Sequence, residues 1–205
     1  MRVVSFDVGV KNLAYAVARI AANQNAQNAQ NAQNVAEIER WGTVCVCDAS
    51  VSARTITKQT TVELVVRALD ELDFLECDTV LVESQPRFAP QNVHVAHAIA
   101  TYFVVRKRAD LDEAVAVHFV HASMKNAMSA RVLGSKPKLD KTCTVKHAKY
   151  ARNKRLAIDA CEALVSRDNT LRATWDAFAK KDDAADCLLQ LVAWSGASAV
   201  TRAFV

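Results

Sequence analysis

Three aspartates stand together at the start of one apolar segment. Residues 180–194 read KKDDAADCLLQLVAW, so Asp182, Asp183 and Asp186 precede a run of apolar side chains. In a helix of about 100° per residue these carboxylates share one side. They suit a helix start, where Asp183 as cap and Asp186 three residues later match a capping box. Three like charges on one face nevertheless repel one another unless a cation lies among them.

Two further carboxylates end apolar strands elsewhere in the chain. Asp7 stands in VVSFDVGVKN just before a glycine, and Glu83 ends the apolar segment TVLVE. Each either caps its own turn or needs a cation, a metal or hydrogen bonds, because burial of an unpaired carboxylate is costly. If the fold gathers them with Asp183 and Asp186, a purely oxygen-based ligand set favours Mg²⁺ or Mn²⁺. Two such ions ~3.5–4 Å apart support phosphodiester hydrolysis.

The elements that must position these residues alternate in an α/β order. Segments 2–10 and 12–20 read as a hairpin, and a third strand follows at 36–48. We then expect the following elements: a helix after Thr57, a buried strand at 78–83, a helix at 91–108, a strand at 114–122, one helical turn at 123–128, a helix at about 144–165 and a last helix from about Asp182. This order predicts a mixed five-stranded sheet, a three-strand meander followed by alternating helices and strands.

Two stretches differ in composition from the rest. The tract NQNAQNAQNAQN has no apolar face, so we interpret it as a loop insertion at about 22–35 within a single domain of residues 1–205. Residues 136–155 hold eight lysines and arginines against one acid, Asp140. This basic segment is either a surface that binds a polyanion or a solvated helix face.

Several common kinds of site lack support in the sequence. No apolar run approaches the ~20 residues of a membrane span, and the start MRVVSFDVGV lacks a signal-peptide layout, so we expect a soluble intracellular protein without membrane contact. The six cysteines contain no CxxC pair, which argues against a zinc or redox motif. With four glycines in the chain there is no Gly-rich phosphate cradle, and we expect no nucleotide cofactor.

Four segments, taken together and in order, resemble the Holliday junction resolvases of the RuvC-type, RNase H-like superfamily. They read SFDVGVKNLAYAV, VLVESQPRF, NVHVAHAIATYFV and KKDDAADCLLQ. The poxvirus and yeast mitochondrial resolvases share the first motif, Asp-hydrophobic-Gly-hydrophobic-Lys-Asn. The resemblance runs with gaps from Arg2 to about Trp194 and omits the NAQ tract. It implies an RNase H-like fold, in which helices flank the mixed sheet.

The resemblance also implies which carboxylates bind metal. The family's strand-one aspartate corresponds to Asp7, its strand-four glutamate to Glu83, and its helical D-x-x-D pair to Asp183 and Asp186. These four residues would hold two Mg²⁺ ions per active site, with Mn²⁺ as an alternative. Asp182 fits this pattern less well, and we interpret it as a residue of the helix start or as a support for the metal ligands.

Basic residues, DNA and a second subunit complete what the resemblance implies. Lys125 and Lys154 are the nearest matches to the basic catalytic residues that bind the scissile phosphate. A homodimer would place two sites on a four-way DNA junction, nick two strands symmetrically and leave ligatable 5′-phosphate ends, with residues 136–155 holding the junction. Arg87 and Phe88 follow Glu83 and would approach the strand exchange point, although packing is our preferred interpretation of Phe88.

Other functions and several locations stay open at this stage. An RNase H-like nuclease acting on RNA–DNA hybrids uses a similar cluster, but Glu83 ends a mid-chain strand rather than lying in the first helix. A non-catalytic protein that binds branched DNA would not need the intact carboxylates. The two-domain actin and sugar-kinase superfamily exceeds this chain length. The location would be the host cytoplasm or virion for a large DNA virus, and otherwise nucleus or cytoplasm; the absence of an Arg/Ser-rich leader argues against mitochondrial import.

Overall fold

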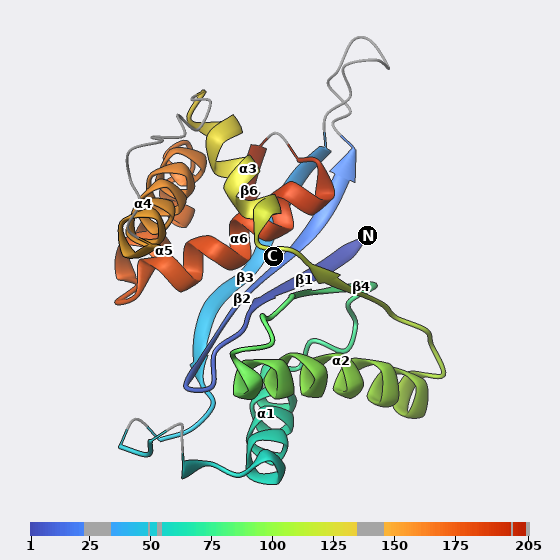
Figure 1. Ribbon diagram of the computed structural model, residues 1–205. Helices are drawn as coiled ribbons and strands as arrows, with labels where there is room; N and C mark the ends of the chain where they lie inside the picture. The colour runs from blue at the N-terminus through green and yellow to red at the C-terminus, as the bar shows by residue number, and fades with distance from the viewer. Residues whose placement is uncertain (23–33, 49, 53–54, 135–145, 198, 204–205) are drawn as a thin grey trace.

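A mixed sheet forms the centre of the molecule, and helices cover both of its faces (Figure 1). The computed structural model describes residues 1–22, 34–48, 50–52, 55–134, 146–197 and 199–203. Within these residues the sheet has six strands in the order β5-β4-β1-β2-β3-β6. Their bounds are β1 (Arg2–Asp7), β2 (Asn12–Ala22), β3 (Asn34–Cys45), β4 (Thr79–Glu83), β5 (Ala116–Val120) and β6 (Ala199–Arg202).

The first three strands form the predicted antiparallel meander. β1 pairs with β2 and β2 with β3, and the second pairing continues to Ala22 opposite Asn34. The predicted low-complexity loop at about 22–35 therefore connects two paired strands, although residues 23–33 lie outside the described part of the chain. β4 and β5 extend the sheet in parallel on the other side of β1.

Two elements near the end of the chain were missed, and the predicted count of five strands is wrong. β6 pairs in parallel with the edge of β3, where Val35 lies opposite Ala199. It has four residues, too few for a clear alternation of apolar and polar side chains. The helix α5 (Asn169–Ala177) is also short, and the Asp168 side chain caps it by accepting from the N–H groups of Thr170 and Leu171.

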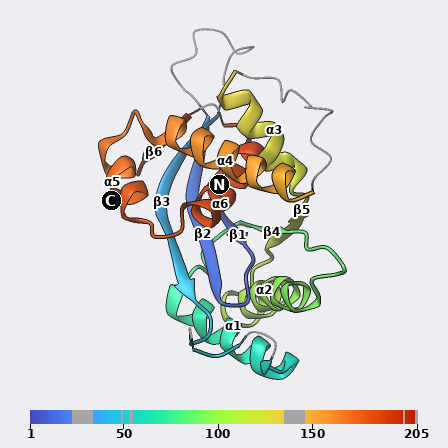
Figure 2. The same cartoon turned by 60° about the vertical axis from the view of Figure 1, so that its left-hand side comes forward.

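The helices divide between the two faces of the sheet (Figure 2). α1 (Lys58–Leu72) and α2 (Pro90–Leu111) cover one face, against Val4 and Phe6 of β1. α3 (Ser123–Val132), α4 (Lys146–Val165), α5 and α6 (Lys181–Ser195) cover the other, where Val3 belongs to the core. α3 is longer than the single turn predicted at 123–128. Among the described residues no helix is both long and apolar enough to span a membrane.

α6 lies directly on the sheet and is fixed there by aromatic and polar contacts. Ala184, Leu188 and Leu191 are fully buried. The Trp41 side chain on β3 donates its Nε1–H to the carbonyl oxygen of Ala184 at 3.0 Å. Trp41 also stacks on Trp175 of α5, with ring centroids 5.7 Å apart. These contacts hold the first turns of α6 at a fixed place above the central strands.

Replacement of Trp41 by Phe measures how much the hydrogen bond from Trp41 to the Ala184 carbonyl stabilises the position of α6. Trp41→Phe removes the indole N–H and leaves the Ala184 carbonyl one partner short, whereas Trp175→Phe removes a buried Nε1 that has no hydrogen-bond partner within the described residues. We expect Trp41→Phe to lower the free energy of unfolding by about 1 kcal/mol more than Trp175→Phe, as measured by urea titration. An equal or larger loss in Trp175→Phe would show that the hydrogen bond does not anchor the helix.

Candidate active site

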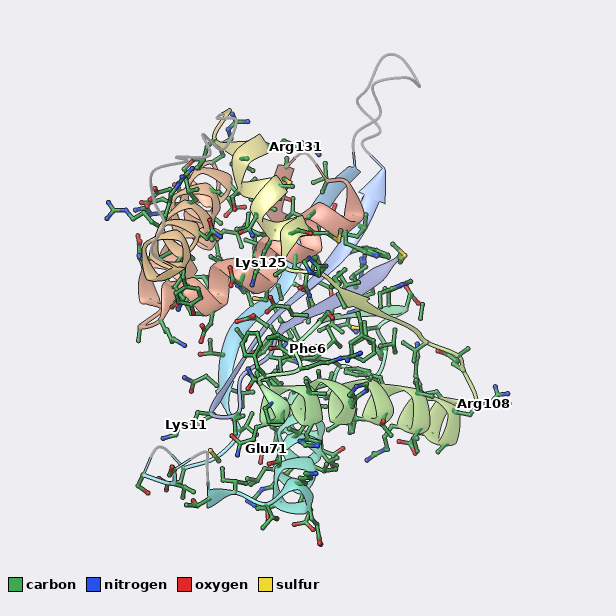
Figure 3. All side chains as sticks on the ribbon, in the orientation of Figure 1. Phe6, Lys11, Glu71, Arg108, Lys125 and Arg131 are labelled. Carbon is green, nitrogen blue, oxygen red and sulfur yellow. The ribbon has the colours of Figure 1, made fainter. Side chains whose placement is uncertain are left out.

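Three carboxylates from three separate elements meet around the amino group of Lys125. Lys125 Nζ lies 3.8 Å from Asp7 Oδ1, 3.1 Å from Glu83 Oε1 and 2.5 Å from Asp186 Oδ2. The lysine comes from α3 and lies where this helix approaches the central strands (Figure 3). The structure thus brings together three of the four predicted metal ligands, with one of the two predicted lysines among them.

Strand pairing accounts for the approach of Asp7 and Glu83. β1 and β4 are parallel neighbours, and Phe6 pairs with Val82, so the next residue on each strand is one of the two carboxylates. Both carboxylates therefore lie at the C-terminal ends of two neighbouring strands. The turn that follows Asp7 needs a glycine, because a Cβ on Gly9 would lie 2.5 Å from the backbone oxygen of Asn12.

Gln190 ties the helix that carries Asp186 to the strand that carries Asp7. This buried side chain, one helical turn after Asp186, donates Nε2–H to Ser5 Oγ at 3.1 Å and to the Phe6 carbonyl oxygen at 3.4 Å. The distance between the Asp7 and Asp186 carboxylates thus depends on a polar contact inside the core. Gln190 was not among the predicted site residues; its signal is a lone amide in the apolar run CLLQLVAW.

Burial of the carboxylates shifts their pKa values. Burial and a hydrogen bond with Glu83 raise the pKa of Asp7 well above its ordinary value. Burial also raises the pKa of Asp186, and the nearby Lys125 charge offsets only part of this effect. The pKa of Glu83 is lowered, because the hydrogen bond with Asp7 and the Lys125 charge outweigh burial. Burial therefore disfavours the charged forms of Asp7 and Asp186, because little water can stabilise charge there.

The two aspartates in the first turn of α6 each have their own lysine. Lys180 Nζ lies 2.5 Å from Asp183 Oδ2, and Lys154 of α4 contacts Asp182. Among the described carboxylates Lys154 forms its ion pair with Asp182, and it lowers the pKa of Asp182 against the effect of burial. The cations that the three aspartates require are therefore three lysines from α3, α4 and the residue before α6.

The predicted capping role of Asp183 is wrong. α6 begins at Lys181 with Lys180 in the cap position, and no side chain makes a cap hydrogen bond there. Asp182 and Asp183 instead lie inside the first turn. The reason is that the Asp183 carboxylate pairs with Lys180 instead of accepting from the backbone. Both carboxylates still interact favourably with the positive end of the helix dipole.

A cleft of about 570 Å³ opens onto the cluster. Asp183 lines it together with Asp7, Glu83 and Asp186, as do Lys125 and Lys154. All six predicted site residues therefore face one cavity.

Phe88 stands at the same cleft, and our preferred interpretation of it as a packing residue is wrong. Its side chain is 88% exposed, because the loop between β4 and α2 carries it away from the core.

The donor set of the cluster suits a hard divalent cation. All four carboxylates offer oxygen atoms alone, which Mg²⁺ and Mn²⁺ prefer, and their mutual repulsion favours a cation of higher charge than an ammonium group. As the described side chains stand, however, no three His, Cys, Asp or Glu residues are placed to hold a metal ion. Lys125 Nζ lies among three of the carboxylates instead.

Solved structures with a similar fold are Holliday junction resolvases. The yeast mitochondrial resolvase matches with a TM-score of 0.60 at 15% identity, over 95% of this chain and 79% of that one. The fowlpox virus resolvase in complex with its substrate junction matches at 0.56 and 17%, over 95% and 97%. RuvC of Thermus thermophilus bound to a junction matches at 0.53 and 13%, over 95% of both chains. No protein-family model and no curated protein sequence matches. These similarities confirm the predicted RNase H-like α/β fold.

Replacement of Asp7 by Asn is expected to stabilise the metal-free protein. Because the folded state raises the pKa of Asp7 above its ordinary value of 3.8, it binds a proton that the unfolded chain has released. Wild-type stability therefore falls as the pH rises from about 4 through the raised pKa. Asp7→Asn avoids this loss, so its melting temperature near neutral pH should exceed that of wild type by roughly 2–6 °C in EDTA.

Asp176→Asn provides the matched control. Hydrogen bonds from Arg172 and Lys181 lower the pKa of Asp176 although desolvation opposes them, so its charged form stabilises the fold above about pH 4 and its removal should give no gain. The gain in Asp7→Asn should shrink as the pH falls toward about 4. A melting temperature at or below that of wild type between about pH 5 and pH 8 would contradict a costly buried charge at Asp7.

Proposed function

We propose that this protein is a metal-dependent endonuclease that resolves four-way DNA junctions. The observation that carries the proposal is the convergence of Asp7, Glu83 and Asp186 at one cleft that Asp183 also lines. A site of this kind suits phosphodiester hydrolysis. The fold is that of solved resolvases, two of which were determined with junction DNA.

Asp7, Glu83, Asp183 and Asp186 would hold two Mg²⁺ or Mn²⁺ ions. When bound, such ions supply an activated water and stabilise the charge on the leaving oxygen. The carboxylates of β1 and β4 would form the rigid side of the site, because the strand register fixes their spacing. Lys154 is partly exposed at the cleft and would bind the scissile phosphate, with Asp182 orienting its amino group.

Basic and aromatic residues around the cleft support a nucleic-acid substrate. Arg152, Lys154 and Arg155 lie on α4, beside the cleft residue Tyr150. Together with the basic segment, of which residues 136–145 lie outside the described chain, they would contact DNA phosphates. The exposed ring of Phe88 would stack on a base at the strand exchange point, where bases are accessible.

Exposed apolar side chains on α2 and β5 support a homodimer. Val104, Val105 and Leu111 are exposed on α2, and Phe119 is exposed on the edge strand β5. Exposed apolar side chains on neighbouring elements are typical of protein–protein contacts. A dimer would present two clefts to one junction, which symmetric cleavage requires.

The proposal predicts paired nicks in a synthetic four-way junction. With Mg²⁺ the protein should cut two strands of like polarity at symmetric positions and leave linear duplex intact, as resolved on denaturing gels. Asp186→Asn removes a metal ligand and should reduce the cleavage rate by at least about 100-fold while junction binding survives. Glu71→Gln on α1, whose carboxylate is exposed and pairs with Arg67, should cleave like wild type.

Three results would contradict this function in different ways. Equal cleavage of an RNA–DNA hybrid would favour the RNase H alternative. Junction binding without cleavage at any concentration of Mg²⁺ or Mn²⁺ would favour a non-catalytic protein that binds branched DNA. Loss of binding in Asp186→Asn, with the melting temperature unchanged, would indicate that the carboxylate contributes to DNA binding rather than to metal binding.

A further inference from the structure

Lys125 stands in the position that a cation bound by the cluster would take. Its amino group is within 4.0 Å of carboxylates from β1, β4 and α6 and only 12% of its side chain is exposed. The other two lysines that pair with aspartates of α6 differ from it. Lys154 and Lys180 are 36% and 53% exposed, and the ion pairs described above join each to a single aspartate.

The surroundings of Lys125 keep its amino group charged and in place. Burial alone would lower the pKa of Lys125, but the charges of Asp7, Asp186 and Glu83 outweigh it and raise the pKa. Its backbone oxygen accepts a hydrogen bond from Ser129 Oγ at 2.9 Å, within the same helix. Lys125 is therefore a permanent cation on a packed element, with a side chain long and flexible enough to leave the cluster.

An ammonium group and a divalent cation exclude each other from this space. Both require the same carboxylate oxygens, and like charges a few ångströms apart repel strongly where little water screens them. As they stand, no three carboxylates among the described residues are positioned to hold a metal, and the Lys125 amino group lies among three of them. A divalent cation that bound there would therefore take the place of this amino group.

We propose that Lys125 is an exchangeable cation: it partly neutralises the cluster before metal binds, and the metal displaces its amino group into the cleft. This inference rests on the metal dependence of the proposed nuclease. The apparent metal affinity is then lower than the intrinsic affinity, because only the molecules in which Lys125 has left the cluster can bind the ion. The displaced amino group remains beside the metal site, where the phosphate of a bound DNA strand offers it a new partner.

The exchange is tested by titrating the protein with Mn²⁺ in the absence of DNA. Electron paramagnetic resonance of the free ion measures how much Mn²⁺ is bound. Lys125→Met removes the competing cation and should bind Mn²⁺ about tenfold more tightly than wild type. Lys58→Met on α1, whose side chain is exposed and whose helix covers the other face of the sheet, makes the same change of charge and should alter the affinity by less than about threefold. An equal or weaker affinity in Lys125→Met would overturn the exchange while leaving the nuclease proposal intact. Absence of Mn²⁺ binding in wild type would overturn both.

A measurement on wild type covers the case in which Lys125→Met does not fold. Acylation of lysines by an amine-reactive ester, read by mass spectrometry, reports how accessible each amino group is. Lys125 should react slowly in EDTA and at least several-fold faster when Mg²⁺ is added, whereas exposed Lys58 on α1 should react at the same rate in both conditions. An unchanged slow rate at Lys125 under conditions where the metal binds would overturn the exchange.

Discussion

Repulsion among buried carboxylates is the constraint on which the rest of this structure depends. Asp7, Glu83 and Asp186 lie close together with little access to water, and a single ammonium group neutralises them only in part. Such an arrangement persists only if the surrounding fold is stable enough to hold it. The raised pKa of Asp7, caused by burial and its hydrogen bond with Glu83, shows that the fold opposes the charged form of this residue. We interpret this unfavourable local charge as the property that creates affinity for a divalent cation.

The fold restrains the cluster from two directions. Parallel pairing of β1 with β4 fixes Asp7 beside Glu83, because backbone hydrogen bonds set the register of the strands. On the helix side, Trp41 and Gln190 hold α6 against β3 and β1 on either side of Asp186 in the sequence. Lys125 belongs to a separate helix and reaches the cluster through a long side chain. The carboxylates thus lie on short side chains of elements that are fixed to one another, whereas the lysine reaches them through a long, flexible side chain.

Much of this arrangement could be predicted from the sequence, and the failures have physical causes. The meander, the buried strand ending at Glu83 and the carboxylates of α6 all follow strong apolar periodicity, which the hydrophobic core then enforces. The four-residue strand β6 and the nine-residue helix α5 are stabilised by tertiary contacts rather than by their own pattern. Local propensity favours aspartate at a helix cap and so predicts Asp183 there, whereas the structure pairs Asp183 with Lys180. Side-chain contacts between distant elements, such as Gln190 with Ser5, leave no periodic signal.

The central claim is that the carboxylate cluster is a metal site, and the most direct measurement is a crystal structure of the protein with Mn²⁺ at a concentration that supports cleavage. Anomalous scattering locates Mn²⁺ independently of the protein atoms. The account predicts an anomalous peak bounded by oxygens of Asp7, Glu83 and Asp186, with the Lys125 amino group withdrawn from them. A cluster without a peak, still neutralised by Lys125 while Mn²⁺ is bound elsewhere, would contradict it.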